Sequence, residues 1–110
     1  MRKEDIVAEV KKMLELLVLG HFELAYDLDY SKILNVEAIS DEIVAYPGHL
    51  TMPPESELLQ LDIYETNFEN QVWIDIPLWF DDTESDLTLG CTICDTATEL
   101  RYSIQDIHVL

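Results

Sequence analysis

The chain has 110 residues, a length that predicts a single domain over residues 1–110 whose hydrophobic core needs no disulfide or metal to hold it. Twenty-three acidic residues stand against six basic ones, and the net charge of −17 argues against direct binding to nucleic acid or to an anionic membrane. No Lys or Arg occurs between Ile33 and Leu100, so we expect this part of the surface to attract positive charge.

The chain begins Met1-Arg2-Lys3 and then turns acidic, without the apolar region of a signal peptide. No stretch reaches the ~20 apolar residues of a membrane helix, and we expect a cytoplasmic protein. Apolar residues at helical spacing predict an amphipathic helix that ends at Gly20, with Glu9, Lys12 and Glu15 facing water. The apolar side of this helix comprises Ile6, Val7, Val10, Met13, Leu14, Leu17 and Val18.

Two shorter segments precede the strands. Residues 21–34 predict a short second helix or a turn-rich stretch in which Phe22 and Leu24 are buried. Asn35 is a favourable N-cap for a third helix that Pro47-Gly48 ends. Residues 49–57 are expected to form a loop, because Pro53-Pro54 disfavours regular structure on both sides.

After Leu58 the apolar period changes from 3.6 to 2, which is typical of strands. We expect strands in residues 59–67, 72–80, 86–94 and 99–110, with a bulge near Gln105-Asp106 where the alternation slips in phase. The predicted fold class is α+β, with two to three N-terminal helices packed on a curved antiparallel sheet of about four strands.

A family resemblance supports this architecture. The "LG-HFE" joint at residues 19–23 and the segments "WIDIPLWF", "SDLTL" and "YSIQDIHVL" resemble the nuclear-transport-factor-2-like cone fold, and within it a small uncharacterised bacterial family. The likeness is clearest over residues 71–110 and is architectural before that. It implies a curved sheet whose concave face lines a cavity, but the superfamily includes enzymes, ligand binders and interaction domains, so it implies no particular activity.

The most acidic stretch is "WFDDTESDLTLGCTICD", residues 79–95. As a calcium loop it fails, because Leu87 replaces the required Gly and Ile93 replaces the bidentate Glu. It fits a hairpin connection, either as a plain solvated turn or as a partner-binding surface. The candidate partner-binding residues are Asp81, Asp82, Glu84 and Asp86, with Trp79 as an apolar anchor. A second candidate patch comprises Glu55, Glu57, Glu65 and Glu69.

The Cys91–Cys94 pair has the C-x-x-C spacing of redox and zinc motifs. Redox pairs of this spacing begin a helix, whereas here both cysteines lie within a predicted strand and point to opposite faces. We therefore expect Cys91 in the core and Cys94 at the surface or in a pocket. We expect no metal site and no cofactor.

One strand carries large side chains on both faces. Trp73, Asp75, Pro77 and Trp79 share the face opposite a fully apolar one, and in a cone fold they would line a pocket within reach of His108. An Asp beside an imidazole is the minimum for acid–base chemistry, although the family's enzymes use fuller constellations. A homodimer seam formed by the two Trp residues is an alternative use of this face.

The leading hypothesis is a non-enzymatic protein that binds and occludes a basic protein partner through its acidic surface. Its most concrete version is an immunity protein that neutralises a cationic nuclease toxin, with carboxylates standing where phosphates would lie. The alternative is a small-molecule-binding protein or enzyme with a pocket around Trp73, Asp75 and Trp79. A third interpretation is that the acidity serves solubility alone.

Overall fold

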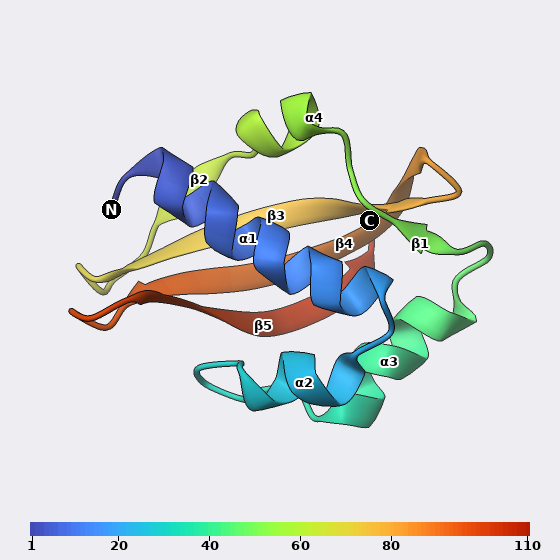
Figure 1. The fold of residues 1–110 in the computed structure, drawn as a ribbon, viewed down its shortest axis with the longest axis horizontal. Coiled ribbons are helices and arrows are strands. Elements are labelled where there is room, and N and C mark those ends of the chain that lie inside the picture. Colours follow the sequence, from blue (N-terminus) through green and yellow to red (C-terminus); the bar gives the residue numbers. More distant parts are fainter.

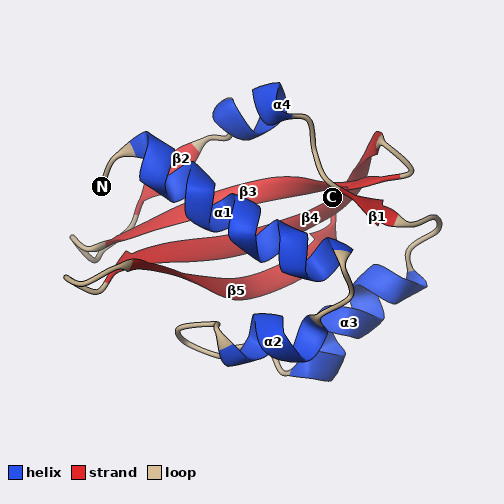
Figure 2. Cartoon of the chain, viewed as in Figure 1, coloured by secondary structure: helices blue, strands red, loops and turns tan.

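Helix α1 (Lys3–Val18) lies across one face of an antiparallel sheet, and α2 (Phe22–Asp27) and α3 (Val36–Ala45) extend this layer past the last strand (Figure 1). The short helix α4 (Glu55–Leu59) lies at the opposite edge of the sheet (Figure 2). This computed structural model describes all residues from Met1 to Leu110. The arrangement of helices on a curved antiparallel sheet confirms the predicted α+β fold class. None of the four helices has the length and apolar character needed to span a bilayer.

Helix α1 forms where the apolar spacing predicts it. Six of the seven predicted apolar residues are buried, and Val18 at the end of the helix is half-buried. Gly20 adopts a φ of +75°, a left-handed conformation that stops the helix at little steric cost. The prediction that Glu9 faces water is wrong, since its side chain is only 11% exposed and its carboxylate accepts a hydrogen bond from the backbone N–H of Tyr102.

The centre of the sheet is a meander of three long strands, β3 (Gln71–Phe80), β4 (Thr83–Asp95) and β5 (Leu100–Val109). Two short strands pair with the outer edge of β3. Strand β1 (Leu50–Thr51) pairs with residues 79–80 and β2 (Ile63–Glu65) pairs with residues 72–74. Between them, residues 75–78 of β3 have no strand partner on this edge. Pro77 lies in this gap, as expected for a residue that lacks a backbone N–H.

Two irregularities shape the long strands. The register between β4 and β5 shifts so that Gln105 is left without an opposing residue, which confirms the bulge predicted there. A second shift occurs opposite Leu78, where the Ser85 hydroxyl donates to the Leu78 carbonyl at 2.6 Å. The β3–β4 connection consists of Asp81 and Asp82, whose φ angles of 52° and 60° are those a tight two-residue hairpin requires.

Asp29 ties the segment after α2 to β5. It is fully buried, and its carboxylate accepts hydrogen bonds from the Ser103 hydroxyl at 2.6 Å and from the Ile104 N–H at 2.8 Å. The backbone N–H groups of Ser31 and Lys32 also donate to it. Four donors around one carboxylate satisfy a charge that would otherwise be costly to bury.

Several local predictions are wrong. Leu24 is 44% exposed, and Ala25 is the buried residue of α2. The expected loop over residues 49–57 contains β1 and the start of α4, because Pro54 serves as the N-cap of a helix rather than as a breaker. The strand expected from Leu59 begins only at Ile63. The third helix, capped by the Asn35 side chain through the Ala38 N–H, is confirmed.

The Asp29 network generates a prediction on stability. The isosteric change Asp29→Asn replaces one carboxylate oxygen, which accepts hydrogen bonds, with an NH2 group, which donates them. The NH2 group then faces a donor in the core, and both are left without an acceptor. We expect the free energy of unfolding to fall by about 2 kcal/mol or more in urea titrations. Asp27→Asn, two residues away and exposed, is the matched control. Equal stability of the two variants would contradict the role assigned to Asp29.

The buried thiol of Cys91 and the buried hydroxyl of Tyr102 lead to a prediction on how stability depends on pH. Burial, reinforced by Asp29, raises the pKa of both the Cys91 thiol and the Tyr102 hydroxyl above their ordinary values of 9.0 and 10.0. As the pH rises, both groups lose their protons in the unfolded chain before they do so in the folded protein. Their contribution to the free energy of unfolding is therefore fully present below pH 9 and is lost at higher pH. We expect the free energy of unfolding to fall by up to ~1.4 kcal/mol per pH unit for each group, with a smaller slope in Cys91→Ala. An identical slope in that variant would contradict this assignment.

Candidate functional site

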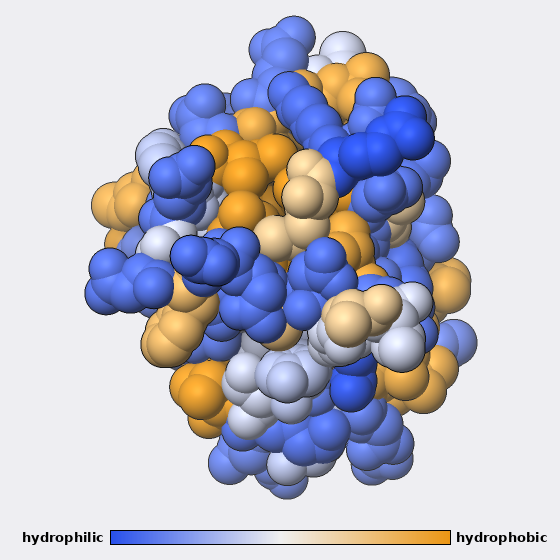
Figure 3. Space-filling model, turned by 90° about the vertical axis from the view of Figure 1, so that its left-hand side faces the viewer, coloured by the Kyte–Doolittle hydropathy of each residue, from blue (hydrophilic) through white to orange (hydrophobic).

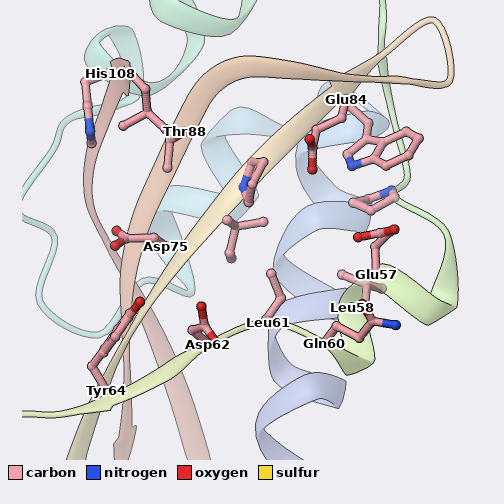
Figure 4. A pocket seen from close by; sticks show the side chains of 15 residues that line it. Glu57, Leu58, Gln60, Leu61, Asp62, Tyr64, Asp75, Glu84, Thr88 and His108 are labelled. Carbon is pink, nitrogen blue, oxygen red and sulfur yellow. The ribbon is translucent and has the colours of Figure 1, made fainter.

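A pocket opens where β3 lacks a strand partner, between β1 and β2 and beside α4 (Figure 4). Its volume is about 330 Å³, within the range of small-ligand sites. We call it the acidic pocket. Its principal polar residues are Glu57, Asp62, Asp75, Glu84, Thr88 and His108. Four of these are carboxylic acids, and no Lys or Arg contributes to the lining.

The sheet register brings the carboxylates together from distant parts of the chain. Ile63 pairs with Ile74, so the preceding Asp62 comes beside the following Asp75. At the other end of the gap, Trp79 pairs with Glu84, which places that carboxylate on the face that Asp75 and Pro77 share. In Figure 4, Asp62 and Asp75 accordingly lie toward one side of the view, and Glu57 and Glu84 toward the other.

Asp75 is held in place by a tryptophan. The Trp73 indole N–H donates to Asp75 Oδ1 at 2.8 Å, so one carboxylate oxygen is fixed while the other keeps its capacity to accept. Gly90, which is opposite Asp75 in β4, makes room for the indole. A Cβ at Gly90 would lie 2.7 Å from Trp73 Cζ2 and 2.7 Å from Asp106 Oδ1. Trp73 therefore positions a pocket residue without lining the pocket itself.

Thr88 lines the pocket between its two ends. It pairs with Pro77 on one side and with His108 on the other. The residue is only 2% exposed, and its hydroxyl has no hydrogen-bond partner within the protein. A buried hydroxyl without a partner costs about 1–3 kcal/mol unless a water molecule or a ligand supplies one.

His108 borders the pocket but does not bond to Asp75. Its Nδ1 lies 3.2 Å from Oδ1 of Asp106, which precedes it by two residues on β5 and adjoins the bulge at Gln105. Of the residues predicted to form a pocket, Asp75, Trp79 and His108 line it. The prediction fails for Trp73, which contributes only through its hydrogen bond to Asp75. Nowhere does the structure gather three or more His, Cys, Asp or Glu side chains in a geometry able to hold a metal ion.

The acidic stretch at the β3–β4 hairpin is divided by the fold. Asp81 accepts a hydrogen bond from the His49 N–H, and Asp86 accepts one from the Tyr46 hydroxyl. Asp82 is exposed at the turn, and Glu84 borders the acidic pocket beside Trp79. The four acids remain exposed at one end of the sheet, but they do not form one loop, because β4 already begins at Thr83.

The second predicted patch is not a single surface. Glu55 pairs with Lys11 at 3.3 Å, and Glu57 belongs to the acidic pocket. Glu65 and Glu69 border a separate recess near the N-terminus together with the exposed Phe68. That end of the molecule shows apolar residues among a mostly hydrophilic surface (Figure 3).

The cysteines are structural. Cys91 is fully buried in the core, as predicted. The expectation that Cys94 lies at the surface or in a pocket is wrong, because it is only 7% exposed and its sulfur accepts from the Asn70 side-chain amide at 3.6 Å. Both thiols are free.

Fold and site together define an α+β domain with helices on one side of an antiparallel sheet and an acidic pocket at its interrupted edge. A family model described as a domain of unknown function, DUF7668, matches residues 14–110, and the chain belongs to this family. No curated protein and no solved structure matches the chain. The resemblance to the nuclear-transport-factor-2-like cone fold stays a prediction.

Sequence reasoning missed Asp62 and Thr88. Asp62 could have been found from the alternation of β2, since Ile63 faces the core and its neighbours face away. Thr88 carries no sequence signal, because its unpaired hydroxyl depends on the register with Pro77.

The close contact of Gly90 with Trp73, which leaves room for the indole beside Asp75, can be tested with a double-mutant cycle. Gly90→Ala should displace the indole and destabilise the protein by about 1–3 kcal/mol through overpacking. In a Trp73→Leu background the same change should cost less, because the crowded ring is absent. Urea titrations of the four proteins measure the coupling. Additive effects would show that Gly90 and Trp73 do not interact.

Proposed function

We propose that the protein is a non-enzymatic binding protein that docks a basic protein partner on its acidic hairpin end. This surface comprises Asp81, Asp82, Glu84 and Asp86, with Trp79 beside them. An immunity protein that occludes the substrate groove of a cationic nuclease toxin is the most specific form of this proposal. Carboxylates at such a surface would occupy the positions of the phosphates that the toxin binds.

The placement of the basic residues away from the hairpin carries the proposal. All six basic residues lie on or just before α1, in the loop after α2, or at the start of β5. The β4–β5 connection and the β3–β4 hairpin lie at opposite ends of the sheet, so Arg101, at the start of β5, is remote from the hairpin (Figure 1). The N-terminus, with Arg2 and Lys3, lies at that same remote end, whereas Lys11 and Lys12 lie midway along α1. The longest dimension of the molecule is 38 Å, several times the ~8 Å screening length at physiological salt.

The ion pairs follow the same division. Lys11, Lys12 and Arg101 each pair with a nearby Glu, and none of these partners belongs to the acidic hairpin end. The hairpin acids thus have no cationic partner within the protein. Trp79 is half-buried beside them, and a partly exposed indole next to charged groups is a frequent anchor in protein interfaces.

Association with a basic ribonuclease as a probe tests this proposal. We expect the association rate to fall several-fold between low and physiological salt, because long-range attraction steers the encounter. The double variant Asp82→Asn, Glu84→Gln should slow association at low salt by roughly threefold to tenfold. Stopped-flow fluorescence measures both effects.

A matched control separates a localised surface from overall acidity. Glu23→Gln with Asp27→Asn removes the same charge from exposed residues of α2, far from the hairpin. This pair should leave the association rate nearly unchanged. A rate that is flat with salt, or that falls equally for both pairs, would exclude docking at the acidic hairpin end.

A further inference from the structure

The acidic pocket is elongated along the unpaired edge of β3. Asp62 and Asp75 lie at one end, and Glu84, paired with Trp79, lies at the other together with Glu57. Asp75 and Trp79 are four residues apart on one strand, which corresponds to about 13 Å at a rise of ~3.3 Å per residue. The pocket thus presents two separated pairs of carboxylates rather than one cluster.

The middle of the pocket is apolar. Leu58, Leu61 and Pro77 line it between the two acidic ends, and Leu61 lies between Asp62 and Glu57 in Figure 4. Aromatic side chains border the ends, since Tyr64 and Trp79 also line the pocket. Such faces attract organic cations that have given up part of their hydration. A chain of methylene groups would cover the apolar middle.

The unpaired hydroxyl of Thr88 adds a third polar point. Thr88 lies opposite Pro77, halfway along β3 between Asp75 and Trp79. Thr88 lines the pocket, and its covered hydroxyl has no partner in the protein, so rotation of the side chain about χ1 lets the hydroxyl accept a hydrogen bond from a donor in the centre of the pocket. This observation is independent of the carboxylates.

The charged groups of the lining indicate that the ligand is a cation. Four exposed carboxylates border a cavity that no Lys or Arg lines, so the cavity disfavours anions. A ligand with positive charges at the spacing of the two acidic pairs is attracted to both ends. Charge-assisted hydrogen bonds from ammonium groups to the carboxylates are the strongest that the lining can form.

We propose that the acidic pocket binds a linear aliphatic polyamine, with one terminal ammonium between Asp62 and Asp75 and the other between Glu57 and Glu84. The methylene segments lie along Leu58, Leu61 and Pro77, and a central ammonium donates to Thr88. This site is distinct from protein docking at the hairpin end and does not depend on it, although Glu84 contributes to both.

Isothermal titration calorimetry with spermidine tests the site directly. We expect one-to-one binding, weakened roughly tenfold or more by Asp75→Asn, which keeps the acceptor for the Trp73 N–H but removes the charge. Thr88→Val preserves shape and should weaken spermidine severalfold. Thr88→Val should not change the affinity for the diamine of equal length, in which a methylene group replaces the central nitrogen of spermidine. Asp27→Asn, which removes an exposed charge elsewhere, is the control.

The outcomes distinguish binding in the pocket from nonspecific attraction of a cation to an acidic protein. Equal weakening by Asp75→Asn and Asp27→Asn would overturn the proposal, as would equal effects of Thr88→Val on spermidine and on the diamine. An oligolysine peptide is titrated in parallel. If the peptide binds in an Asp75-dependent manner and spermidine does not, the pocket recognises side chains of a protein and the polyamine proposal is wrong.

The two proposals fail independently. Asp75→Asn and Thr88→Val leave Asp81, Asp82 and Asp86 intact and should not change the salt-dependent association with the basic ribonuclease. Loss of spermidine binding with intact ribonuclease association supports separate sites. If both variants also slow that association as much as the hairpin variants do, the pocket is not a distinct site.

Discussion

The interrupted outer edge of β3 is the constraint on which the rest of the structure depends. One face of β3 buries Ile74, Ile76 and Leu78 beneath the helices, so the strand cannot slip by a residue without exposing the core. Its other face carries Trp73, Asp75, Pro77 and Trp79. Because β1 and β2 cover only the ends of its outer edge, four residues of the strand remain unpaired there, and the chain between the two short strands passes as α4 beside an open pocket.

This geometry places acidic residues together at two sites, the acidic pocket and the hairpin end. The register places Asp62 beside Asp75 and Glu84 beside Trp79, while the tight hairpin directs Asp81 and Asp86 to contacts with His49 and Tyr46. Four of the six basic residues form ion pairs elsewhere, and these exposed pairs add little stability. Exposed acids without a cationic partner also lie on α2 and α3, but the hairpin end and the pocket each bring several carboxylates beside an aromatic side chain. Each would attract a cation of different size.

Local patterns predicted the elements whose formation depends on a single periodicity. The stripe on α1, the Asn35 cap of α3 and the bulge at Gln105 all follow from residue spacing. Residue spacing gave wrong predictions where tertiary contacts determine the local structure. Pro54 caps a helix because α4 packs Leu58 into the core. Glu9 is covered because its carboxylate accepts the hydrogen bond of the Tyr102 N–H in β5. For the site, the sequence indicated Asp75, Trp79 and His108, but the pairing of Asp62 with Asp75 and the orphaned Thr88 hydroxyl exist only in the folded register.

The most direct measurement of where this protein meets positive charge is a backbone-amide NMR titration with spermidine. The account predicts chemical-shift changes in two adjoining groups of amides, residues 57–64 and 75–79 apart from Pro77, together with Glu84 and Thr88, while the exposed acids of α2 and α3 stay unperturbed. Shifts spread evenly over every acid-bearing surface, or confined to the Asp81-Asp82 turn, would contradict it.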